Sequence, residues 1–183
     1  MDPSPSGALL HRLLDDYAAL ADAQVLAQFR ALLALAPGCY RRDCWPGHFT
    51  GAAWLVSPTG AQVLLTHHRK LDRWLQLGGH ADGDSDLGRV ALREATEESG
   101  LDGLALEPAI FDLDRHWIPP RAPDPGHWHY DVRFVVRATH STQFVVSAES
   151  KALEWRDVAA IANDARFDDS MRRMSRNWLT IIS

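Results

Sequence analysis

The sequence of 183 residues has few cysteines, no long apolar run and no surplus of positive charge. Its two cysteines, Cys39 and Cys44, are too few for a disulfide framework and lack the spacing of a metal site, which favours a reducing compartment. Neither an apolar run of about 18 residues nor a basic segment followed by an apolar one is present, so no membrane span or secretory leader is expected. Nineteen Lys and Arg against 24 Asp and Glu give a net charge of −5, which argues against duplex nucleic acid as a partner. We therefore expect a soluble, cytoplasmic protein.

The remaining composition is that of an average globular protein, with 46% hydrophobic and 23% charged residues. A chain of this length suits one domain, alone or with an extension. Residues 7–36 are rich in Leu and Ala at the spacing of two amphipathic helices, and Pro37-Gly38 ends the second. We expect residues 1–40 to form an N-terminal helical extension. It would pack on a domain formed by residues 41–183, or on a second copy of the chain in a homodimer.

The rest of the chain alternates between β-type and helical patterns. The expected strands lie at 48–56, 61–66, 105–118, 127–138 and 144–147, and the expected helices at 87–99, 155–164 and 168–182. The first two strands should form a hairpin. A Gly-rich acidic loop at 78–86 precedes the first of these helices, and Gly100 should end it. Strands enclosed by helices at both ends of the sequence indicate an α/β fold with a mixed sheet between helical layers.

One stripe of the helix expected at 87–99 carries three glutamates, Glu94, Glu97 and Glu98, because positions i, i+3 and i+4 share a face. Like charges at this spacing repel, and Arg93 is expected to project in another direction, so a divalent cation is the natural compensating charge. Gly78-Gly79 lets the backbone approach a ligand closely and offers carbonyl oxygens, which suit Mg²⁺. The alternative is a solvated acidic surface in which glutamate serves helix propensity.

This stretch resembles the signature of the Nudix hydrolase family. That signature is a glycine, five residues, a glutamate, seven residues, and then Arg-Glu-apolar-x-Glu-Glu-x-Gly-apolar. The residues that match in register are Gly79, Arg93, Glu94, Glu97, Glu98, Gly100 and Leu101, with Ala95 as a weak match. The first glutamate of the signature falls on Ser85, which leaves the partner of Arg93 open. Asp84 and Asp86 flank that position as partial substitutes.

The resemblance implies an α/β/α sandwich that hydrolyses a nucleoside diphosphate linked to another moiety, with Mg²⁺ or Mn²⁺ as cofactor and water attacking phosphorus. By position, Glu97 and Glu98 would be direct metal ligands, and Glu94 a ligand or an aid to water activation. Gly78 would lend its carbonyl, and Arg93 would hold a glutamate in place. Such ions neutralise charge on a diphosphate and acidify the attacking water. The implied partner is a small nucleotide-type molecule.

A second polar group is expected on the strand at 127–138. Alternation places His127, His129 and Asp131 on one side of this strand. His80 lies in the Gly-rich turn, so His80, His127 and His129 could converge over the acidic helix as metal ligands or as phosphate donors. The alternative is a solvent-exposed strand face rich in histidine. Asp131 and Arg121, which lies in a Pro-rich loop, are further candidates for substrate binding.

The spacing also resembles isopentenyl-diphosphate isomerase, a Nudix-fold enzyme that binds its metal largely through histidine. In that family a cysteine precedes the Gly-His of the turn and a Glu-x-Glu pair begins the later strand. Here these positions hold Gly78 and the pair His127 and His129. The sequence therefore leaves two alternatives to a hydrolase open. One is an isomerase without its cysteine, and the other is a non-catalytic protein that senses a nucleotide or sugar nucleotide, which Ser85 favours.

Overall fold

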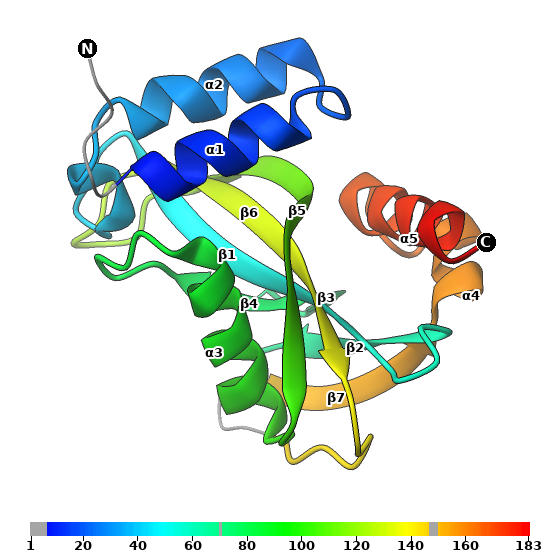
Figure 1. The fold of residues 1–183 in the computed structure, drawn as a ribbon. Helices are drawn as coiled ribbons and strands as arrows, with labels where there is room; N and C mark the ends of the chain where they lie inside the picture. The colour runs from blue at the N-terminus through cyan, green and yellow to red at the C-terminus, as the bar shows by residue number, and fades with distance from the viewer. Residues whose placement is uncertain (1–6, 70, 147–149) are drawn as a thin grey trace.

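The computed structural model describes residues 7–69, 71–146 and 150–183, which form helices on both faces of one mixed sheet (Figure 1). The helices are α1 (Ala8–Tyr17), α2 (Ala23–Leu33), the short 3₁₀ helix η1 (Gly38–Tyr40), α3 (Leu87–Ser99), α4 (Val158–Asn163) and α5 (Asp169–Ile182). The strands are β1 (Gly47–Val56), β2 (Gln62–His68), β3 (Arg73–Leu75), β4 (Leu77–His80), β5 (Leu104–Ile118), β6 (His127–Ala138) and β7 (Ser150–Asp157). The expected α/β fold is confirmed. Within the described part of the chain, no helix has the length and apolarity needed to cross a membrane.

The sheet has the order β3-β2-β1-β6-β5, with β4 also paired to β1 and β7 to β2. β1 and β6 run parallel, and their register pairs His48 with His129 and Thr50 with Asp131. β4 runs antiparallel to β1 and pairs His80 with Thr50. Three strands that are far apart in the sequence therefore bring His48, His80 and His129 to one end of the sheet.

Two hydrophobic cores lie on opposite faces of the sheet because side chains alternate along each strand. On one face, Phe49 and Leu55 of β1 belong to a core that includes buried residues of α1, α2 and α3. On the other face, Trp54 and Val56 belong to a core that includes buried residues of α4 and α5. The expected domain boundary between residues 40 and 41 stays a prediction, and the first core is continuous across it.

Helix α3 has the bounds expected from the sequence. Its N-cap is Asp86, whose side chain accepts a hydrogen bond from the backbone N–H of Arg89 at 3.0 Å. At its other end, Gly100 adopts the left-handed conformation with φ of 65°, which glycine enters without steric cost. Because Val90 and Ala91 are fully buried against the sheet, the orientation of the glutamates on this helix is set by its packing.

Several segments differ from the sequence-based expectation. Residues 78–80, expected within the loop at 78–86, belong to β4, because glycine at 78 and 79 allows this segment to lie against β1. The expected hairpin is reduced to the pairing of Val56 with Val63, since β2 turns away to pair with β3 and β7.

The C-terminal half differs as well, since β7 (Ser150–Asp157) was not expected from the sequence. The helix expected from residue 155 begins at Val158, because residues 155–157 complete β7 and Asp157 caps α4 through the backbone N–H of Ala160 at 2.8 Å. Residues 144–146 are not in a strand, and Ser147 lies outside the described residues.

Candidate active site

The carboxylates of α3 approach the backbone of β4 at its two glycines. A Cβ atom at Gly79 would lie 2.5 Å from the carboxylate carbon of Glu94, so glycine is what leaves room for this side chain. The backbone N–H of Gly78 donates to Oε1 of Glu98 at 2.9 Å. Glu97 is exposed on the same helix. Two carboxylates thus flank the Gly78-Gly79 backbone, and a third is presented to solvent by the same helix.

Arg93 joins α3 to β4. Its guanidinium donates to Oε1 of Glu94 at 2.8 Å and to the backbone carbonyl of His80 at 3.2 Å. The expectation that Arg93 projects away from the glutamates is therefore wrong, because its long side chain reaches the carboxylate of its neighbour in the sequence. The hydrogen bond to Glu94 raises the pKa of Arg93. The hydrogen bond from Arg93 therefore holds the Glu94 carboxylate, and the missing side chain of Gly79 leaves room for it.

Ser85 stands where the family signature has its first glutamate, and the flanking aspartates are engaged elsewhere. Asp84 accepts hydrogen bonds from the guanidinium of Arg89 at 2.8 and 2.6 Å, and this contact holds the pKa of Asp84 below its usual range. Asp86 caps α3. Because Arg93 has Glu94 and a backbone carbonyl as its partners, the two aspartates do not take the place of the missing glutamate.

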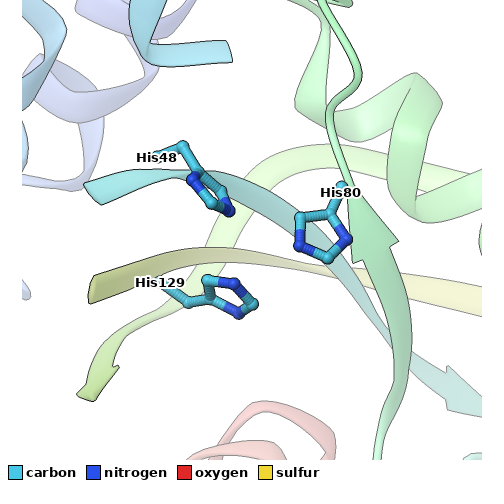
Figure 2. Close-up of side chains that lie close together, drawn as sticks. All are labelled: His48, His80 and His129. Atoms are coloured by element: carbon cyan, nitrogen blue, oxygen red, sulfur yellow. The ribbon is translucent and has the colours of Figure 1, made fainter. Parts of the chain in front are cut away.

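Three imidazoles meet where β1, β4 and β6 lie side by side (Figure 2). One ring nitrogen each of His48, His80 and His129 lies within 4.8 Å of those of the other two. The ring centroids are 5.2 Å apart for His48 and His80, 4.8 Å for His48 and His129, and 4.9 Å for His80 and His129. The structure therefore brings His80 and His129 together, but on the side of β4 opposite to Glu94 and not over the acidic helix as expected. Sequence reasoning missed His48, whose place in the group depends on the register between β1 and β6.

His127 and Asp131 adjoin the histidine cluster of His48, His80 and His129. Nε2 of His127 lies 3.2 Å from Nε2 of His129, and its Nδ1 lies 2.9 Å from the carbonyl oxygen of Pro125. Asp131 accepts hydrogen bonds from the Thr50 hydroxyl and the Arg133 guanidinium. His127 and Asp131 are 7% and 5% exposed, so the alternative of a solvent-exposed strand face is wrong for these residues.

Burial and charge determine which of these groups are ionised. Burial alone would raise the pKa of Asp131, but the Arg133 guanidinium and the Thr50 hydroxyl favour its charged form, and its pKa lies below the usual value. Among the imidazoles, burial is the largest cause of a lowered pKa, which is about 4 for His48, about 4 for His80 and about 3 for His129. These three rings are therefore neutral at pH 7, and each presents a nitrogen lone pair.

Arg121, predicted to bind substrate, lies exposed in the loop before β6. Its backbone pairs with that of Asp124, with N···O distances of 3.0 and 2.7 Å. It is not among the residues that the structure gathers at the histidine cluster or at the glycines of β4. Only a substrate large enough to extend from these residues to the loop would therefore contact Arg121.

Comparison with known proteins places these features in a family. A family model for the NUDIX domain matches residues 48–178, a range that includes the glutamates of α3 and the histidine cluster. A NUDIX-family hydrolase from Clostridium perfringens is 25% identical, with a TM-score of 0.56 over 74% of this chain and 98% of that chain. An Ap4A hydrolase from C. elegans is 15% identical, with a TM-score of 0.56 over 73% of this chain and 96% of that one.

A third solved structure, the dihydroneopterin triphosphate pyrophosphohydrolase of E. coli, is 18% identical, with a TM-score of 0.56 over 72% of this chain and 95% of that one. A search of curated protein sequences found no match. The family model covers well over half of the chain, and the structural similarity extends over nearly the whole length of each of these proteins. This chain belongs to the Nudix hydrolase family.

Proposed function

We propose that this protein hydrolyses the diphosphate bond of a nucleoside diphosphate linked to another moiety, with Mg²⁺ or Mn²⁺ as its cofactor. The observation that carries this proposal is the placement of Glu94 and Glu98 around the Gly78-Gly79 backbone, with Glu97 on the same helix. The metal-ligand atoms that these glutamates and glycines offer are carboxylate and carbonyl oxygens. This donor set fits a small, hard cation, which binds a few carboxylates and completes its shell with water and substrate phosphates.

In this proposal, Glu97 and Glu98 hold the cation together with the carbonyl oxygen of Gly78. The bound cation supplies charge neutralisation on the diphosphate and acidifies a water molecule. Glu94, held by Arg93 at 2.8 Å, is a further ligand or orients the attacking water. The water oxygen forms a bond to one phosphorus, the bridging P–O bond breaks, and the bridging oxygen leaves with the other phosphoryl group. The proton lost by water passes to a carboxylate or to solvent.

Substrate contacts are proposed for His80, His127 and His129, which can donate ring N–H groups to phosphate oxygens. Arg121 is proposed as a further phosphate contact from its loop. Asp131 is buried and already accepts hydrogen bonds from Thr50 and Arg133. Its direct contact with a substrate stays a prediction. The names of two similar structures, an Ap4A hydrolase and a pyrophosphohydrolase, are in line with the proposed substrate class.

The test is turnover of nucleoside triphosphates, dinucleoside polyphosphates, sugar nucleotides and CoA, with Mg²⁺ or Mn²⁺ and with chelator. We expect one class to be hydrolysed and chelator to abolish the reaction. Glu97→Gln and Glu98→Gln should each lower kcat/KM by at least about a hundredfold, since the lost charge weakens the hold on the cation.

The matched control is Glu107→Gln, which removes a carboxylate on β5 that pairs with Arg137 at the surface. This variant should retain wild-type turnover. Full activity of Glu97→Gln and Glu98→Gln would contradict the proposed roles. Metal-dependent thermal stabilisation by one compound, with no product from any of them, would support the nucleotide-sensing alternative instead.

A further inference from the structure

We propose that His48, His80 and His129 bind a divalent transition-metal ion of the class that prefers imidazole, such as Zn²⁺ or Co²⁺, at a site separate from the glutamates of α3. The three ligands come from three strands of one sheet, so their backbones are held by ladder hydrogen bonds on β1, β4 and β6. Their candidate ligand atoms lie within 4.8 Å of one another. In a tetrahedral zinc site with Zn–N bonds of about 2.0–2.1 Å, nitrogens are about 3.3 Å apart. To bind the ion, the ring nitrogens would therefore have to approach one another by up to about 1.5 Å.

His48 supplies an independent observation that points to a ligand. It is only 2% exposed, and neither of its ring nitrogens makes a hydrogen bond of good geometry with the described residues. Buried polar atoms are almost always paired, and an unpaired one in a native fold requires an explanation. A metal ion that shares the lone pair of one nitrogen gives this ring the partner that the polypeptide does not.

A chain of hydrogen bonds through His127 holds the ring of His129 in place. The carbonyl oxygen of Pro125 can only accept, so the Nδ1 of His127, at 2.9 Å, must be the donor. The other nitrogen of this ring, Nε2, lies 3.2 Å from Nε2 of His129. Such a contact on the far nitrogen is how proteins fix the tautomer of a metal-binding histidine.

The donor set determines the class of ion. Three neutral nitrogen donors suit Zn²⁺, Co²⁺ and their neighbours, whereas Mg²⁺ requires oxygen ligands. The glutamates reach β4 from the opposite side, because Gly79 faces Glu94 while the next residue, His80, joins the cluster. His80 and His129 are partly exposed. A bound ion would therefore keep a position open for water or for an anionic oxygen such as that of a phosphate.

The test measures metal binding and not activity. Metal-free protein, prepared with chelator and then freed of it, is titrated with Co²⁺ and followed by visible absorption, with Zn²⁺ as competitor. The titration is performed in the Glu97→Gln/Glu98→Gln double variant, so that ions at the glutamates do not contribute. We expect one Co²⁺ per chain, displaced by Zn²⁺. This result is independent of whether the protein hydrolyses a diphosphate.

In the same background, His80→Gln and His129→Gln should each weaken Co²⁺ binding by at least about a hundredfold, because each removes a ligand. His48→Gln should do the same if circular dichroism and thermal melting show that it folds, and the two partly exposed positions keep the test decisive if it does not. The matched control is His140→Gln, an exposed histidine beyond the end of β6. Absence of Co²⁺ binding, or unchanged binding in His80→Gln and His129→Gln, would overturn the proposal.

Discussion

Gly79 and His80 are consecutive residues of β4 that serve different parts of the site. Successive residues of a strand face opposite sides. Gly79 accordingly lies against the Glu94 carboxylate of α3, while His80 joins His48 and His129. One side of β4 thus faces carboxylate oxygens of α3, and the other side faces the imidazole nitrogens of the histidine cluster.

At the residue scale we predict that Gly79→Ala impairs catalysis more than stability. The added Cβ would lie 2.5 Å from the carboxylate carbon of Glu94, which is the flexible end of a side chain and can move aside. The backbone therefore tolerates the change, and the free energy of unfolding should remain within about 1 kcal/mol of the wild type. The displaced carboxylate should lower kcat/KM by on the order of a hundredfold, as misplacement of a reacting group does.

Steady-state kinetics and chemical denaturation of the same preparation separate these two effects. Gly38→Ala is the matched control, because an added Cβ at Gly38 meets no atom within 4 Å. A Gly79→Ala protein with full activity would show that the room above this glycine is not needed.

At the scale of the element, α3 is the segment that the sequence describes best. Its expected bounds, 87–99, are those of the structure, since cap residues and a continuous apolar face lie within the segment itself. The neighbouring β4 was missed because a Gly-Gly-His segment has low strand propensity. Its pairing with β1 depends on contacts remote in the sequence.

We predict that Asp86→Ala lowers the free energy of unfolding by about 1 kcal/mol, because it removes the acceptor for the backbone N–H of Arg89 at the start of α3. Asp86→Asn should remain close to the wild type, since asparagine caps helices as well as aspartate does. Urea denaturation followed by circular dichroism measures both. An equal loss in the two variants would mean that the charge of Asp86, and not its capping, stabilises the helix.

At the scale of the whole molecule, Arg133 joins the strands of the sheet to the C-terminal helix. Its guanidinium lies 3.0 Å from a carboxylate oxygen of Asp112, 2.9 Å from one of Asp114 and 3.2 Å from one of Asp131. It also donates to the hydroxyl of Ser170 on α5 at 2.5 Å. The side chain is only 4% exposed. This buried ion cluster therefore connects β5, β6 and α5.

We predict that Arg133→Met destabilises the protein by about 3–5 kcal/mol, because buried carboxylates lose the cation that compensates them. Arg30→Met is the control, since the ion pair of Arg30 with Asp15 is largely exposed and is expected to contribute at most about 1 kcal/mol. Thermal and urea unfolding provide the comparison. Similar stability of the two variants would show that the buried carboxylates are accommodated without Arg133.

The sequence by itself was sufficient for the features that are local in the chain. The glutamates of α3 follow from helical spacing, the ends of α3 follow from its caps, and the alternation of β6 placed His129 and Asp131 on one face. The family resemblance likewise depended on a short contiguous motif, which the family match confirms.

Only the tertiary structure decided which of these local features meet. His48 joins His129 because β1 and β6 pair in parallel, and it joins His80 because β4 pairs with the other side of β1. Arg93 reaches Glu94, and Asp84 and Asp86 are engaged elsewhere, because α3 packs on the sheet in one orientation. Strand register and helix packing are fixed by contacts between distant residues, so spacing along a single chain does not reveal them.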